Sequence, residues 1–492
     1  MQSCCNTGTE GTAGETSEAG PAGSLAGRGG AWMTARYGLS TFVNLGNMLV
    51  LTWWIGPRTY GVFVSAVTIT TVLASLARCG FDTYLVRAEE DSREVRNLAF
   101  TLTAVASTLL AAIGLALTPW LRDWYREPAF PYPYIVLLLT VPLIGMAGPP
   151  MAILERQLRF REVASLELGG QFASFLVGAT LAWRKCGIWA PVMGHVAWQS
   201  LVLIAALRAV KSRFRLTREL NHAREMLAFG TGVSASLRVW QLRSLVNPLL
   251  VSRFAGPEGV AFVALAIRVA EGLSFVRTAA ARVAIAALAS TRHRLEAWKN
   301  GLRDATVVQV VLLGALLAGF GVAGPVVVPW LLGARWAPML GVYPFVAAAV
   351  LMQAAVNLEV SALIVAGRQW AVTRAYLWNV LVLLSSSLLL VPRFGISAYG
   401  WAEVAACVTF FGIHRELRKL VSISFGPVIV WLIPFVILCS WPLLPAGWRA
   451  LSIIPLAVLL ARWFGRSVGW GSQESSLTSL RRLKAYVWSN GC

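Results

Sequence analysis

Residues 55–63 read Ile55-Gly56-Pro57-Arg58-Thr59-Tyr60-Gly61-Val62-Phe63 and join two long apolar stretches of the chain. About 200 residues later, residues 255–262 read Ala255-Gly256-Pro257-Glu258-Gly259-Val260-Ala261-Phe262 and join two more. A second pair of phrases, at nearly the same offset, begins with Gly187-Ile188 and with Gly395-Ile396. Two independent matches at nearly one offset predict that the second part of the chain is a duplicate of the first.

The composition indicates a chain that lies mostly in lipid. Of its 492 residues, 57% are hydrophobic and 13% are charged, whereas soluble domains are about 45–50% apolar and about 25% charged. The formal net charge is +20, but the basic residues gather in short loops, where positive charge sets the orientation of membrane helices. We expect no nucleic-acid binding, because that needs a basic domain with interleaved aromatic side chains.

Nothing in the sequence predicts a metal, a cofactor or a catalytic residue. The seven cysteines form no CxxC pair and have no histidine at ligand spacing, so we expect neither disulfides nor a metal site. Neither GxxxxGKS nor GxxxxGKT is present, so no P-loop for nucleotide phosphates is expected.

The chain has about fourteen apolar stretches of the length that crosses a bilayer, which is about 20 residues. Lipid tolerates only helices or closed barrels, and strand-type alternation is scarce, so the predicted fold is an all-α polytopic membrane protein with about 14 transmembrane helices. The spans predicted in the first half are 37–55, 60–80, 97–119, 133–154, 163–183 and 187–207. Those predicted in the second half are 227–252, 259–281, 305–329, 338–366, 371–391 and 395–414, followed by 426–445 and 448–464.

Loop charge predicts the orientation of these spans. Alternate loops carry about 21 basic residues against about 9 on the opposite side, which places both termini in the cytoplasm. Six spans per half is an even number, so the halves share one orientation and are related by a pseudo-two-fold axis along the membrane normal. The predicted parts are a disordered cytoplasmic tail at 1–32, a six-helix bundle at 33–210, a cytoplasmic linker at 211–226, a second six-helix bundle at 227–420, two additional helices at 421–465 and a cytoplasmic tail at 466–492.

Four arginines lie within predicted spans of the second half, namely Arg238 and Arg243 in the seventh and Arg268 and Arg277 in the eighth. A charge inside a span costs free energy and usually faces a cavity or a partner. Guanidinium donors match phosphate oxygens bidentately, so we expect these arginines to line a cavity and bind a phosphate or pyrophosphate. The alternative is an internal brace, because Arg268 and Glu271 share a helix face at i, i+3 spacing.

Other ionisable residues in or near the spans leave two interpretations open. The carboxylates that are candidates for ion coupling or for internal pairing are Glu167, Glu271, Glu359 and Glu403. We expect His195 and His414 to be packing or interface residues rather than proton relays. Asp123 and Glu127 flank Trp124-Tyr125 in an outer loop, where a solvated loop with interfacial aromatic residues is favoured over acid–base chemistry.

Several phrases resemble those of a known family. The phrase Gly56-Pro57-x-x-Tyr60-Gly61 is followed by Gly80-Phe81-Asp82-x-x-Leu85-Val86-Arg87 and by the basic loop Leu154-Glu155-Arg156-Gln157-Leu158-Arg159-Phe160-Arg161. Over roughly residues 33–420 the pattern resembles the Wzx-type lipopolysaccharide and exopolysaccharide flippases of the multidrug/oligosaccharidyl-lipid/polysaccharide exporter superfamily. The second copy departs from the phrase, with Val260-Ala261 where Tyr-Gly would stand.

The resemblance implies two six-helix bundles arranged as a V around a central cavity, with two extra C-terminal helices, in the bacterial inner membrane. It implies a polyprenyl-pyrophosphate-linked oligosaccharide as substrate, moved to the outer leaflet by alternating access and often driven by ions. Spans one, two, seven and eight line the cavity in such proteins, and Arg238, Arg243 and Arg268 fall on two of these. Membrane lipids are implied partners, and so are the polysaccharide polymerase and glycosyltransferases of the pathway.

Two other functions stay open at this point. A cation-coupled small-molecule exporter of the same architecture would have a more apolar cavity with one carboxylate. A membrane glycan polymerase or ligase would need a long outer loop for its chemistry, whereas the outer loops predicted here have roughly 5–15 residues.

Overall fold

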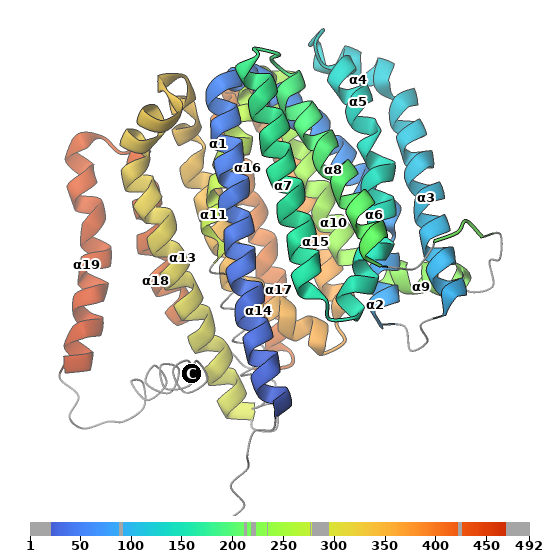
Figure 1. Cartoon of the computed structure of the whole chain (residues 1–492). Helices are drawn as coiled ribbons and strands as arrows, with labels where there is room; N and C mark the ends of the chain where they lie inside the picture. The colour runs from blue at the N-terminus through green and yellow to red at the C-terminus, as the bar shows by residue number, and fades with distance from the viewer. Residues whose placement is uncertain are drawn as a thin grey trace, which may run out of the picture.

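The computed structural model describes residues 21–87, 92–210, 214–217, 223–233, 235–275, 277, 295–421 and 426–468. The regular structure in these residues is helical throughout, and nine of the helices in this part of the chain are long and apolar enough to cross a membrane. The long helices run side by side as a bundle, and the short helix α9 lies across one end (Figure 1). An all-α polytopic membrane fold is therefore confirmed, while the count of 14 helices stays a prediction.

The bounds of the helices follow the predicted spans closely. In the first half the helices are α1 Pro21–Arg78, α2 Phe81–Arg87, α3 Arg93–Ala116, α4 Thr118–Tyr125, α5 Pro131–Leu138, α6 Thr140–Arg156, α7 Phe160–Trp183 and α8 Trp189–Ala209. The next set is α9 Ala223–Val233, α10 Ala235–Leu242, η1 Arg243–Leu245, η2 Asn247–Val251, α11 Ser252–Leu273 and α13 Leu295–Leu332. It continues with η3 Ala334–Gly341, α14 Tyr343–Val365, α15 Gln369–Phe394, α16 Ile396–Ala406, η4 Cys407–Thr409 and α17 Phe410–Arg418. The last helices are α18 Gly426–Cys439, η5 Trp441–Leu443 and α19 Ala446–Val468.

The two Gly-Pro phrases have the same backbone conformation. Gly56 has φ 76° and ψ 169°, and Gly256 has φ 72° and ψ 178°, so each glycine is a non-helical residue inside a long helix. Positive φ is a conformation that glycine adopts without steric cost, and the proline that follows is preset for the first turn of a helix. Each phrase therefore ends one helical segment and begins the next within α1 and α11.

The second pair of phrases behaves alike. Gly187 (φ 56°) and Gly395 (φ 67°) both have positive φ, and they lie just before α8 and α16. The sequence repeat is thus matched by local backbone geometry at both pairs. A rotation that relates the complete halves stays a prediction.

Two predicted boundaries differ from the structure. Helix α1 begins at Pro21, inside the segment predicted as a disordered tail at 1–32. The first ten residues of α1 include four glycines, which disfavour a helix, so local propensity does not account for this start. The helix continues directly into the first span. The tail residues 1–20 and 469–492 lie outside the described residues, as do 211–213 and 218–222 of the linker.

The seventh predicted span is interrupted. It was expected to be continuous over 227–252, but α9 is a separate helix whose Met226 packs against Phe81, Leu85 and Leu98 of the first half. The expected boundary between linker and second bundle therefore falls within α9. Further along, residues 247–251 form a π-helix that contains Pro248, and a proline removes a backbone donor from the helical hydrogen-bond pattern.

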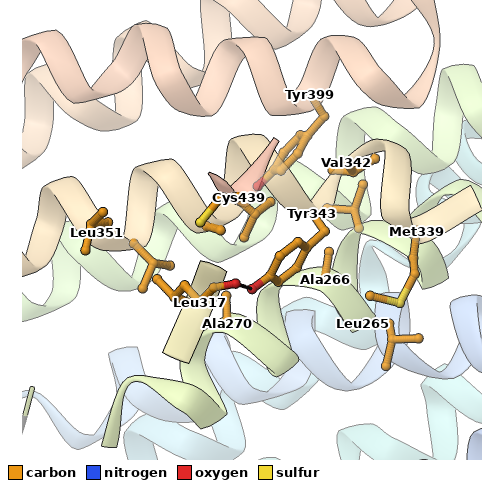
Figure 2. Close-up of a cluster of buried hydrophobic side chains, with 14 of the residues drawn as sticks. Leu265, Ala266, Ala270, Leu317, Met339, Val342, Tyr343, Leu351, Tyr399 and Cys439 are labelled. Atoms are coloured by element: carbon orange, nitrogen blue, oxygen red, sulfur yellow. Dashed lines mark hydrogen bonds between the residues drawn. The ribbon is translucent and has the colours of Figure 1, made fainter. Parts of the chain in front are cut away.

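The main core cluster belongs to the second half and includes one first-half residue. Figure 2 shows part of it, where the hydroxyl of Tyr343 donates to the carbonyl oxygen of Leu317 at 2.7 Å. Trp336 is fully buried in this cluster. Tyr60 of α1 also belongs to it, edge-on to Trp336 at 5.9 Å between ring centroids. The halves therefore share a packed apolar region.

The two ends of the bundle are distinct. Helix α1 begins, and α19 ends, at the end where α2 and α9 lie, whereas α4 lies at the opposite end (Figure 1). The end with α2 and α9 is called the inner end and the end with α4 the outer end. Their assignment to cytoplasm and exterior rests on loop charge and stays a prediction.

Candidate functional site

The halves meet at the outer end through a backbone contact between Gly61 and Pro257. A Cβ atom at Gly61 would overlap with the carbonyl oxygen of Pro257. A glycine is therefore required at position 61, which explains the Tyr-Gly pair of the first phrase. The equivalent Ala261 is fully buried but carries a side chain, so the repeat is asymmetric where the two helices cross.

Trp124 provides a second outer contact that the sequence did not reveal. Its Nε1 donates to the carbonyl oxygen of Leu249 at 2.8 Å, and Arg253 Nη1 donates to the carbonyl oxygen of Trp124 at 3.1 Å. The guanidinium of Arg253 also lies over the Trp124 ring, 5.3 Å from its centroid. The loop expected to be a solvated, interfacial segment thus binds the second half, and Glu127 pairs with Arg58 at 3.0 Å. Trp124 and Arg253 are both visible in the sequence. The residues that they bind lie more than a hundred positions away along the chain, so the sequence alone did not pair them.

The inner end has its own contact between α1, α9 and α10. A Cβ atom at Gly230 would overlap with the carbonyl oxygen of Cys79, so α9 lies directly against the end of α1. Arg238 of α10 donates from Nη2 to the carbonyl oxygen of Gly230 at 3.1 Å. Arg238 therefore lies at the inner contact, near the ends of the spans.

Asp82 is the acidic residue of this inner contact. Its Oδ2 lies 3.5 Å from Arg78 Nη1, and its Oδ1 is buried without a hydrogen-bond partner. Burial raises the pKa of the Asp82 carboxyl above its ordinary value, while the guanidinium groups of Arg78 and Arg238 act in the opposite direction. The inner contact thus joins a first-half carboxylate to a second-half guanidinium through electrostatic attraction.

Between the two contacts, the packing of α11 changes abruptly. Every residue from Gly259 to Ala266 is buried, whereas Arg268 and Glu271, one turn further on, are exposed. Ala270, Gly272 and Ser274 stay buried, so α11 keeps one packed side, and the side that carries the two charges is left uncovered by the described residues. This uncovered side lies between the outer and the inner contact.

Arg268 is the predicted residue with the clearest open position. It lies about eleven residues beyond Pro257, which is about 16 Å along a helix, and thus near mid-span. No carboxylate among the described residues, Glu271 included, forms an ion pair with Arg268. Its guanidinium interacts electrostatically with the hydroxyl of Tyr60, on α1 of the first half. The internal brace considered for Arg268 and Glu271 is therefore not formed.

Arg243 is placed differently, because it pairs with a buried carboxylate. Its Nη2 donates to Glu403 Oε2, and the Tyr399 hydroxyl donates to Glu403 Oε1 at 2.7 Å. The guanidinium also lies 4.8 Å from the centroid of Trp240. Glu271 interacts electrostatically with the Tyr399 hydroxyl, so these groups form one polar network between η1, α11 and α16.

Glu359 and His414 form a second buried pair in the second half. Oε1 of Glu359 lies 2.9 Å from Nδ1 of His414, and both side chains are less than a tenth exposed. The other carboxylate oxygen of Glu359 has no hydrogen-bond partner. A buried imidazole–carboxylate pair fits packing and proton transfer alike, so the packing role of His414 and ion coupling through Glu359 both stay predictions.

The remaining predicted residues lie apart from this network. Arg277 is half-buried and interacts electrostatically with the hydroxyl of Tyr376 on α15. Glu167 is half-buried on α7, in the first half. The described residues hold no cluster of three or more side chains suited to a metal ion.

Arg268 offers a positive charge to an anionic ligand at mid-span, between the outer contact and the inner contact. An arginine facing lipid without a partner would cost at least about 2.5–3.5 kcal/mol. That cost is removed if the guanidinium faces water or a bound anion. Arg268 can supply bidentate hydrogen bonds to phosphate oxygens.

Comparisons with known proteins match the chain to proteins of polysaccharide biosynthesis. The profile of the family described as polysaccharide biosynthesis protein matches residues 50–341. The teichuronic acid biosynthesis protein TuaB of Bacillus subtilis (strain 168) is 20% identical over 400 residues, which cover 80% of this chain and 78% of that protein. The succinoglycan biosynthesis transport protein ExoT of Rhizobium meliloti (strain 1021) is 24% identical over 295 residues, 58% of this chain and 59% of that protein.

Solved structures show the same fold at low sequence identity. The lipid II flippase MurJ, in an inward closed conformation, superposes with a TM-score of 0.70 at 11% identity, over 89% of this chain and 99% of that chain. An inward-facing multidrug resistance transporter of the MATE family, from the MOP superfamily, superposes with a TM-score of 0.57 at 12% identity, over 77% of this chain and 95% of that chain.

Proposed function

Because the chain belongs to the family of polysaccharide biosynthesis proteins, we propose that it moves a lipid-linked oligosaccharide across the cytoplasmic membrane. The substrate is an oligosaccharide on a polyprenyl pyrophosphate, and the reaction is transport without covalent chemistry. The relatives TuaB and ExoT are named for polysaccharide biosynthesis and for transport in it, which supports this substrate class. The fold shared with a lipid II flippase is compatible with it.

The observation that carries the proposal is the position of Arg268. It is an exposed, mid-span guanidinium with no carboxylate partner among the described residues, and it interacts electrostatically with Tyr60 of the first half. A pyrophosphate is the anionic part of a polyprenyl-linked saccharide, so it supplies an anionic partner that the described residues do not give to Arg268. Arg268 binds the pyrophosphate, and the polyprenyl chain remains in lipid.

The two contacts give the protein the means to alternate between two openings. Gly61 and Pro257 close the outer end, and the inner contact includes Arg238 and Asp82. Opening one contact while the other stays closed exposes Arg268 to one side of the membrane at a time. We propose this alternating access as the mechanism.

The test is substitution at Arg268 in a strain that lacks its own copy of the gene. Arg268→Gln removes the charge at an exposed position, so the protein should reach the membrane at normal levels but lose polysaccharide export. Arg268→Lys should retain part of the export, because the charge remains and the bidentate geometry is lost. Arg184→Gln is the matched control, since Arg184 is exposed in the turn between α7 and α8 and its loss should leave export unchanged.

Normal export by Arg268→Gln would contradict the proposal. Loss of export with loss of the protein from the membrane would contradict it too, unless Arg268→Lys restores both.

A cation-coupled exporter of small molecules is the second candidate, favoured by the exposed carboxylate of Glu271 near the same interface. The two candidates differ in the residue that transport requires. In an exporter of organic cations, Glu271→Gln abolishes transport and Arg268→Gln does not. The proposed flippase shows the opposite order.

A further inference from the structure

The face of α1 that meets the second half changes character along the helix. Near the outer end this face is packed, because Tyr60 and Val64 lie against the second-half core. The same face continues at i, i+4, i+7 and i+11 spacing, from Val64 through Thr68 and Thr71 to Ser75. These three residues are half-buried, so the face that seals the outer contact is left partly open further along.

The hydroxyl groups on this face have no hydrogen-bond partner among the residues that the structure describes. A buried Thr or Ser in a helix usually bonds a carbonyl of its own preceding turn, and Thr70 does so with Ala66 and Val67 at 3.3 Å and 3.0 Å. Thr68, Thr71 and Ser75 make no such bond within the described part of the chain. They are the hydroxyl face of α1, a row of three free donors and acceptors.

The sequence repeat places this face opposite the charged one. The repeat offset of about 200 residues relates Thr68 to Arg268 and Thr71 to Glu271, and the two members of each pair lie equally far along the chain from their Gly-Pro phrases. Gly61 and Cys79, which mark the outer and inner contacts, are about 27 Å apart along the helix at 1.5 Å per residue. One wall of the interface between them is neutral and hydroxyl-bearing, and the other is charged.

We propose that the hydroxyl face of α1 binds the saccharide of the transported molecule, while Arg268 on the opposite wall binds its pyrophosphate. This inference rests on the proposed function and adds to it the residues that contact the sugar. A hydroxyl both donates and accepts hydrogen bonds, as a sugar hydroxyl does, so three free hydroxyls in a row suit a neutral saccharide. A charged wall would instead lose hydration against a neutral ligand without an ionic partner to offset it.

The test is ligand binding by the purified full-length protein. The probes are a short-chain polyprenyl diphosphate and the same diphosphate carrying a neutral oligosaccharide. The triple variant Thr68→Val, Thr71→Val and Ser75→Ala removes the hydroxyls with little change of shape. It should bind the oligosaccharide-bearing probe about tenfold or more weakly, as expected for the loss of several neutral hydrogen bonds, and bind the sugar-free probe as the wild type does.

The control is Thr70→Val, on the opposite face of the same helix, which should leave binding of both probes unchanged. Arg268→Gln should weaken binding of both probes alike, which separates the two proposals. Unchanged binding of the oligosaccharide-bearing probe by the triple variant overturns the saccharide role and leaves the proposed function standing. Equal loss of both probes also overturns it. If the triple variant does not fold, Thr71→Val alone decides, with the same outcomes at a smaller fold-change.

Discussion

The guanidinium of Arg243 donates to one oxygen of the Glu403 carboxylate, and this pair joins η1 to α16 inside the second half. Glu403 is almost fully buried, and its other oxygen accepts the Tyr399 hydroxyl. Arg243 is therefore a structural brace in this geometry, which favours the pairing interpretation for Arg243. Arg268, exposed and without a carboxylate partner among the described residues, keeps the binding interpretation.

Arg243→Gln should destabilise the protein, because it leaves Glu403 buried without a cation. Removal of one partner of a buried ion pair costs about 3–5 kcal/mol, so the thermal unfolding midpoint of the purified protein should fall clearly. Adding Glu403→Gln to the same protein should recover a large part of the loss, since no charge is then left unpaired. Glu94→Gln is the control, because Glu94 is exposed at the start of α3 and lies outside this network, and it should change stability by less than about 0.5 kcal/mol, as exposed positions do. A double variant no more stable than Arg243→Gln would show that the pair does not act as a brace.

Gly61→Ala should prevent the outer contact from closing. The added methyl group would overlap with the Pro257 carbonyl oxygen, and overpacking of this kind costs about 1–3 kcal/mol. We expect a lower unfolding midpoint and strongly reduced export. Gly319→Ala is the control, because a Cβ there meets no neighbour within 4 Å, and it should be neutral or slightly stabilising. Equal effects of the two substitutions would contradict the close approach.

Trp124→Phe should loosen the outer contact without leaving a large void. The substitution removes the hydrogen bond from Nε1 to Leu249 and keeps an aromatic ring for Arg253. In a cysteine-free background, Val64→Cys should then react faster with a membrane-impermeant thiol reagent added from outside. Trp120→Phe is the control, because Trp120 stacks on Trp124 and is about half exposed. Identical labelling rates in both variants would exclude Trp124 as a closing residue.

The orientation predicted from loop charge places the outer end outside the cell. In a cysteine-free background, Asp123→Cys should react with an impermeant reagent on intact cells, because Asp123 is exposed at the outer end. Leu216→Cys, at an exposed side chain of the linker, should react only after the cells are permeabilised. Labelling of Leu216→Cys on intact cells would reverse the topology.

Local features of the fold could be predicted from the sequence, because neighbouring residues determine them. The Gly-Pro phrases gave the positions of Gly56 and Gly256, whose backbone conformations agree closely. The length of the apolar stretches predicted most of the helices. Helix α9 was not predicted, because its short amphipathic pattern is continuous with the apolar run that follows it.

The partners within the candidate site could not be predicted. Arg243 and Glu403 are 160 residues apart, and Glu359 and His414 are 55 residues apart, so their pairing depends on how separate helices pack. The sequence identified each of these four residues but gave no information on which carboxylate meets which cation. That no described carboxylate pairs with Arg268 likewise follows only from tertiary structure.

The packing of α9 differs from the division of the chain that the sequence repeat predicts. The predicted division of the chain assigns most of α9 to the second bundle, yet Met226 of α9 is packed into the first half, next to Phe81 and Leu85. In the proposed alternating access, the moving body therefore starts at α10, and α9 belongs to the stationary frame. Arg238 of α10 donates to Gly230 of that frame, so the proposed opening of the inner end requires this hydrogen bond to break.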